Sequence, residues 1–172
     1  MTRNHYIPFF VLFLICGSFA AGCVQPASKV KANENLSAFR LIITTYNHAE
    51  RINDGTSIYI VTDSSITVKK RYMLSEKDTT LFSKKITADY ILPIKKINLN
   101  TLKGSYFNNC IMITSGTEYD VSTTRGHITK DIHLHCYYLW QIDEIIKDIN
   151  KMVPAEYQIN YVAVDNKQDC EL

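Results

Sequence analysis

From residue 37 onward, apolar and polar residues alternate with a period of two, which is the pattern of half-buried β-strands. β-Branched and aromatic residues cluster between turn signals such as Asn53-Asp54-Gly55, whose residues tolerate the positive φ of a tight hairpin. The pattern predicts strands at residues 39–46, 57–62, 66–74, 80–88, 110–114, 117–122 and 128–138, with a closing strand at 157–161. Residues 89–109 contain Pro93 and lack a clean period, so they are expected to form a long connection with a short extended piece.

The period changes once, near the C-terminus. Ile142, Ile145, Ile146 and Ile149 follow the i, i+3, i+4, i+7 rule of an amphipathic helix, and Pro154 stops that helix. We therefore expect an α+β fold, built on a mainly antiparallel β-sheet or partly open barrel of about seven or eight strands. One amphipathic helix near the C-terminus should pack across it.

The first 22 residues have the three-part layout of a secretory signal. Residues 1–8 carry Arg3 and no acidic residue, an apolar run occupies residues 9–16, and small residues follow. A helix that crosses a bilayer needs about 20 apolar residues, so this run is too short for a permanent membrane span. A cleaved signal peptide is the favoured interpretation.

The residues Ala20-Ala21-Gly22-Cys23 resemble the bacterial lipobox, although Ala20 stands where Leu is commonest. The resemblance implies cleavage between Gly22 and Cys23, a diacylglycerol thioether on Cys23, and usually an N-acyl chain such as palmitate. Two or three acyl chains would hold the protein firmly on membrane lipid. An ordinary signal peptide cut nearby, for instance after Ala20 or Gly22, is the alternative.

The resemblance implies a lipoprotein of the bacterial cell envelope. Val24 stands where an Asp retains lipoproteins at the inner membrane in enterobacteria-like cells, so the outer membrane is favoured where two membranes exist. The expected parts are the signal peptide at 1–22, the lipidated cysteine and flexible tether at 23–36, a single β-rich domain at 37–164, and a polar tail at 165–172.

Charge narrows the range of partners. Of 19 basic and 17 acidic residues only Arg3 leaves with the signal, so the mature chain of 150 residues carries 18 minus 17, or +1. This balance argues against a dedicated nucleic-acid binder.

The cysteine count allows at most one intramolecular disulfide in the mature chain. Cys16 leaves with the signal and Cys23 is assigned to lipid, so Cys110, Cys136 and Cys170 remain. A disulfide between Cys110 and Cys136 ranks first, because both fall in expected strands. The alternative is that all three are thiols.

Three histidines are the candidate metal ligands: His127, His133 and His135. Residues two apart on a strand share a face, so His133 and His135 could place two imidazoles near one ion, with His127 or Asp131 as a third ligand. Most even-numbered residues of this strand are apolar and are expected to face the core, so Cys136 should be buried and the odd-numbered histidines should face solvent. A solvated histidine face without metal is therefore the competing interpretation.

No catalytic motif is found in the sequence. It contains no G-x-S-x-G elbow and no Gly-rich phosphate loop, so neither an enzyme nor a cofactor is expected. The leading hypothesis is a non-catalytic binding or structural module that contacts an envelope protein, glycan or peptide through its sheet face or through residues 137–140. The alternatives are a metal-binding protein or metal-dependent enzyme built on the three histidines, and an inhibitor-like lipoprotein.

Overall fold

The computed structural model of the chain describes residues 38–47, 55–72, 77–110 and 116–161. These residues all belong to one compact unit, Asn33–Leu172. The expected signal peptide, the cleavage site at Gly22 and Cys23, the tether and the polar tail lie outside the described residues.

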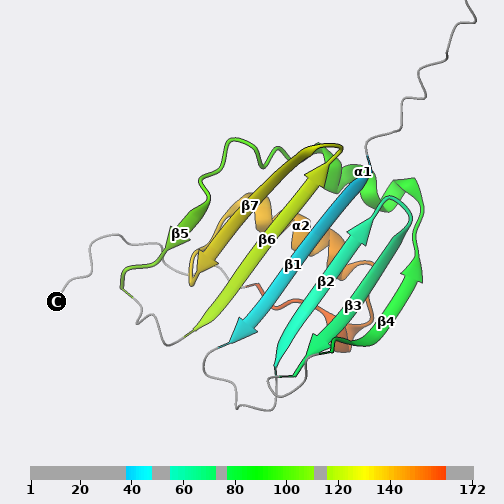
Figure 1. Cartoon of the computed structure of the whole chain (residues 1–172), viewed down its shortest axis with the longest axis horizontal. Helices are drawn as coiled ribbons and strands as arrows, with labels where there is room; N and C mark the ends of the chain where they lie inside the picture. The colour runs from blue at the N-terminus through cyan, green and yellow to red at the C-terminus, as the bar shows by residue number, and fades with distance from the viewer. Residues whose placement is uncertain (1–37, 48–54, 73–76, 111–115, 162–172) are drawn as a thin grey trace, which may run out of the picture. The chain divides into compact units, whose positions relative to one another are not determined.

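Seven strands form one open sheet (Figure 1). In chain order they are β1 Phe39–Asn47, β2 Thr56–Thr62, β3 Ser65–Arg71, β4 Thr79–Lys85, β5 Ser105–Phe107, β6 Thr117–Arg125 and β7 Ile128–His135. Their order across the sheet is β4-β3-β2-β1-β6-β7-β5, and every neighbouring pair is antiparallel except β5 with β7. The predicted α+β class and open, mainly antiparallel sheet are confirmed.

Two helices pack on one face of this sheet, α1 Ala88–Lys96 and α2 Trp140–Asn150, and a short 3-10 helix, η1 Ala155–Tyr157, follows (Figure 1). The four isoleucines of α2 that the period identified are all buried. They meet the inward residues of the central strands, among them Leu41, Ile43 and Val121. Each such side chain contributes on the order of 1.5–3 kcal/mol when fully buried, so this inner face holds the fold together.

The expectation of a single helix was wrong, because residues 88–96 form α1 where a connection was predicted. Ile91 and Ile94 lie one turn apart and are both buried in the core, while Leu92 between them is exposed. Pro93 suggested a break, but it lies close to the end of a short helix that the buried pair stabilises through tertiary packing.

The closing strand predicted at 157–161 does not form. Ile159 is buried, but its backbone bonds to the side chain of Asn150 instead of to a strand: Ile159 N donates to Asn150 Oδ1 at 2.8 Å, and Asn150 Nδ2 donates to Ile159 O at 2.9 Å. One amide side chain at the end of α2 thus takes the place of a ladder partner. Of the strand predicted at 110–114, Cys110 lies in a turn and the rest is outside the described residues.

Candidate functional site

The face of the sheet opposite the helices, here called the outer face, carries polar side chains at the open end of the β6–β7 hairpin, where β6 begins and β7 ends. Directly paired residues of an antiparallel ladder lie on the same face. Glu118 of β6 pairs with His135 of β7, and Asp120 pairs with His133. We call these four residues the acid–histidine ladder; the residues between them, Tyr119 and Leu134, are buried in the core on the inner face.

Glu118 and His135 form the buried end of this ladder. His135 Nδ1 lies 3.0 Å from Glu118 Oε1, and their side chains are only 2% and 8% exposed. The ring of Phe107 in β5 packs near both histidines, with its centroid 6.4 Å from that of His135 and 5.4 Å from that of His133. The edge strand β5 therefore shields a polar pair that would otherwise face water.

His133 lies between two carboxylates. Its Nδ1 is 2.7 Å from Asp120 Oδ1, and its Nε2 is 4.0 Å from Glu118 Oε2. A histidine acting as general base toward a hydroxyl nucleophile would need one ring nitrogen facing that hydroxyl. Both ring nitrogens of His133 face carboxylates instead, so this geometry favours fixed positioning of charge over nucleophilic catalysis.

The predicted histidine trio is not brought together. His127 lies in the turn before β7, whereas His135 ends that strand eight residues later, which at about 3.3 Å per residue corresponds to about 26 Å. His135 is also buried rather than solvated, so the expectation of a solvated histidine face holds for the exposed His127 and the partly exposed His133 and fails for His135. Among the residues that the structure describes, no group of three or more His, Cys, Asp or Glu side chains could hold a metal ion.

Beside the ladder the outer face carries a shallow groove with a volume of about 290 Å³, here called the outer groove. Its polar and apolar side chains come from three neighbouring strands: Ile42 and Thr44 of β1, Asp120 and Ser122 of β6, and Asp131 and His133 of β7. Asp120 and Asp131 are exposed. They are diagonal neighbours across the ladder, a spacing of about 7–8 Å. The groove thus presents two carboxylates, two hydroxyls and an apolar floor.

Sequence reasoning missed the two carboxylates of the ladder. Only the histidines were identified, because Glu118 and Asp120 are 17 and 13 residues away in the chain. A signal was present: a Glu-x-Asp pair and a His-x-His pair stand in two consecutive expected strands around the turn at 124–126. In a hairpin these two pairs must share a face when the register is symmetric about that turn.

The expected disulfide between Cys110 and Cys136 is wrong. Cys110 is disulfide-bonded, whereas Cys136 keeps a buried thiol. Cys136 directly follows β7 with a positive φ of 47°, and its N–H donates to Thr117 O at 3.1 Å. Cys136 is buried, as the strand alternation predicted.

Most of the aromatic junction at residues 137–140 takes part in packing. Tyr137 contacts the ring of Tyr106, and Tyr138 stacks on Tyr161 with centroids 5.5 Å apart. Trp140, at the start of α2, is 61% exposed. The junction therefore leaves one large aromatic ring at the surface, and the outer groove is the better candidate site.

No model of a known protein family matches this chain, and no curated protein sequence matches it. No helix among the described residues is long and apolar enough to cross a membrane.

Proposed function

We propose that this protein is a non-catalytic, lipid-anchored binding module of the bacterial cell envelope, whose outer groove binds a cationic segment of another envelope protein. The observation that carries this proposal is the charge of the groove. Asp120 and Asp131 present two exposed carboxylates next to partly buried apolar and hydroxyl side chains on the sheet face opposite the helices. Such a surface complements a lysine or arginine side chain on an extended segment.

The acid–histidine ladder supports this function by fixing the groove. Asp120 is held by His133 at 2.7 Å, and His133 lies against Glu118, which is itself bonded to buried His135. A chain of buried and half-buried polar contacts limits the rotamers of Asp120, so less side-chain entropy is lost on binding. The ladder is thus a positioning device for a carboxylate in the groove.

The anchor rests on the N-terminal sequence. With Cys23 lipidated, residues 24–36 form a polar spacer of 13 residues that reaches at most about 45 Å when extended. This reach would let the domain contact partners that protrude from the same membrane.

The anchor is tested by labelling cells with radioactive palmitate. Wild-type protein should be labelled, Cys23→Ser should lose the label, and Cys16→Ser should keep it because that cysteine lies in the expected signal peptide. Unchanged labelling of Cys23→Ser would contradict lipidation at this residue.

The groove is tested by titrating the detergent-solubilised protein with an extended lysine-containing peptide and with a glutamate-containing peptide of the same length. We expect saturable shifts of groove amide signals with the first peptide only. Asp131→Asn should weaken binding about tenfold, which corresponds to about 1.4 kcal/mol. The control Glu144→Gln removes one exposed carboxylate from α2 and should leave the affinity unchanged. Equal binding of both peptides would contradict the proposed chemistry.

A further inference from the structure

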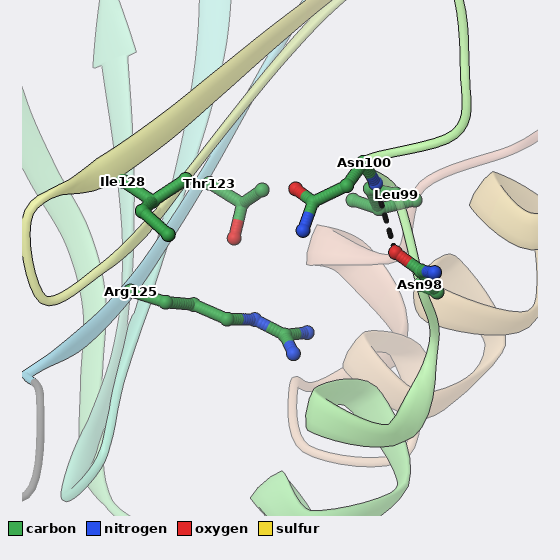
Figure 2. Close-up of a pocket in the computed structure, with 6 residues that line it drawn as sticks. All are labelled: Asn98, Leu99, Asn100, Thr123, Arg125 and Ile128. Atoms are coloured by element: carbon green, nitrogen blue, oxygen red, sulfur yellow. Dashed lines mark hydrogen bonds between the residues drawn. The ribbon is translucent and has the colours of Figure 1, made fainter.

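A small cavity lies on the inner side of the sheet, where β6 ends near the segment that follows α1 (Figure 2). Its volume is about 60 Å³ and its lining residues are Asn98, Leu99, Asn100, Thr123, Arg125 and Ile128. Thr123 is five residues along β6 from Glu118, or about 17 Å, and on the opposite face of the sheet. The cavity is therefore separate from the outer groove.

The hydroxyl of Thr123 is the first sign that this cavity holds something. Thr123 is 5% exposed, and its Oγ1 is buried without a hydrogen bond to any described residue. A buried hydroxyl without a hydrogen bond destabilises the folded state, so such groups usually have a partner in the folded protein. A bound group in the cavity would supply that partner.

Two further donors converge on the same space. Figure 2 shows the side chain of Asn100 directed toward Thr123, and the side chain of Arg125 running below Thr123 in this view so that its guanidinium ends beneath Asn100. Asn100 is positioned by its own backbone N–H, which donates to Asn98 Oδ1 at 3.0 Å. The Arg125 guanidinium is fixed at one corner, since Nη2 donates to Ile97 O at 3.1 Å and Cζ lies 5.6 Å from the centroid of the Phe39 ring. Arginine has five N–H donors, so this arrangement leaves others for a ligand.

The surrounding charge favours an anion. Lys130 is the cross-strand partner of Thr123, and Lys95 lies 5.5 Å from the centroid of the same Phe39 ring that Arg125 contacts. Lys130 donates to the carbonyl of Leu102 at 2.6 Å and Arg125 to that of Ile97, so these bonds leave both positive charges unneutralised. Lys95 is paired with Asp63. A negatively charged ligand would therefore gain from the local field.

We propose that this cavity, the oxyanion pocket, binds the oxygen atoms of a small oxyanion or carboxylate through Arg125, Asn100 and Thr123. A single water needs about 10–15 Å³ of such space, so about 60 Å³ has room for a group of a few heavy atoms and not for a sugar or nucleotide. Arginine forks suit two oxygens of one group, and the Thr123 hydroxyl and the Asn100 amide add donors from the other side. The group can be a free inorganic ion or the carboxylate of a larger ligand.

The test is a titration of the full-length, detergent-solubilised lipoprotein with phosphate and, separately, with acetate, at constant ionic strength set by chloride. We expect saturable amide shifts near residues 98–100 and 123–128 with at least one probe. Saturation by phosphate alone identifies a free oxyanion, and saturation by acetate alone identifies a carboxylate group as the occupant.

Variants distinguish the pocket from a general surface effect. Arg125→Gln should weaken binding at least tenfold, whereas Arg40→Gln, which removes an exposed arginine that is not part of the cavity, should leave it unchanged. Thr123→Val should weaken binding about fivefold and Thr123→Ser should preserve it, because only the second keeps the hydroxyl. This pair keeps the test valid if Arg125→Gln fails to fold. If neither probe gives saturable shifts, or if Thr123→Val and Thr123→Ser bind with equal affinity, the proposal is overturned. Ordered water would then be the occupant of the cavity.

Discussion

Glu118 and His135 face each other directly across the β6–β7 ladder and are buried together on the sheet face that the helices do not cover. The next pair on the same face of the hairpin is also a carboxylate and a histidine, Asp120 and His133, but it is solvent-accessible: the Asp120 side chain is 55% exposed. Both pairs are directly opposite residues of one ladder and differ mainly in burial, so comparing them isolates the effect of burial on their contribution to stability.

Removal of each carboxylate should have different effects on stability. Glu118→Ala leaves His135 without that partner in a buried position and should cost about 3 kcal/mol or more. Asp120→Ala breaks an exposed pair and should cost less than about 1 kcal/mol. Urea midpoints at an unchanged m-value measure both losses. Equal losses of unfolding free energy in the two variants would contradict the expected difference between the buried and the exposed pair.

Asp63 should make the fold sensitive to acid. Partial burial raises the pKa of Asp63, but hydrogen bonds from Lys95 and from the N–H of Phe39 outweigh it, and the pKa is lowered overall. A lowered pKa means that the stabilising effect is complete above the unfolded value of about 3.9 and is lost as pH falls through the folded value. Asp63→Asn should cost roughly 0.5–1.5 kcal/mol at pH 6, and the difference from wild type should shrink toward pH 3. A difference independent of pH, measured by denaturant unfolding at both values, would rule out this ionic contribution.

Tyr119 should limit stability in alkali. Burial, with smaller effects from Cys136 and Tyr59, raises the pKa of Tyr119 to about 12. The unfolded phenol ionises near pH 10, so stability from this group is complete below about pH 10 and is lost as pH rises toward the folded pKa. Tyr119→Phe should cost about 1 kcal/mol at neutral pH, because the hydroxyl donates to Asn160 O at 3.1 Å. The loss of stability above pH 10 should be less steep in this variant than in wild type, and an equally steep loss would contradict the assignment.

The cysteines give a covalent prediction. Cys110 is disulfide-bonded and Cys136 is a buried thiol. Because Cys16 is expected to leave with the signal and Cys23 to carry lipid, we predict Cys170 as the partner of Cys110 in the mature protein. Peptide mapping without reduction should recover a Cys110–Cys170 cross-linked peptide, and Cys136 should be alkylated only after unfolding. Recovery of a Cys110–Cys136 peptide would overturn this pairing.

Much of the fold could be predicted from local pattern. The alternation around Leu41 and Ile43 and the helical spacing of Ile142 to Ile149 follow directly from burial of one face, and both features are present. The two wrong predictions, a strand at 157–161 and a connection at 88–96, concern segments whose structure is set by tertiary contacts. Asn150 replaces a strand partner for Ile159, and packing of Ile91 and Ile94 stabilises a helix that contains Pro93.

The site was less predictable because it depends on register. Parity correctly placed His133 and His135 on one face, but it could not show that Phe107 from a distant edge strand would bury one of them. The two carboxylates of the ladder could be inferred only by combining the Glu-x-Asp and His-x-His pairs with a symmetric hairpin register. The oxyanion pocket joins residues far apart in the chain, and no spacing rule in a single sequence reveals such contacts.

The most direct test of the central claim is photocrosslinking in intact cells from position 122, in the outer groove, compared with position 144 on α2. The proposed function predicts one reproducible envelope protein crosslinked from position 122 and not from 144, and its loss when Asp120→Asn and Asp131→Asn are combined. No crosslinked partner from position 122, or one that persists in the double variant, would contradict a groove that binds a cationic partner.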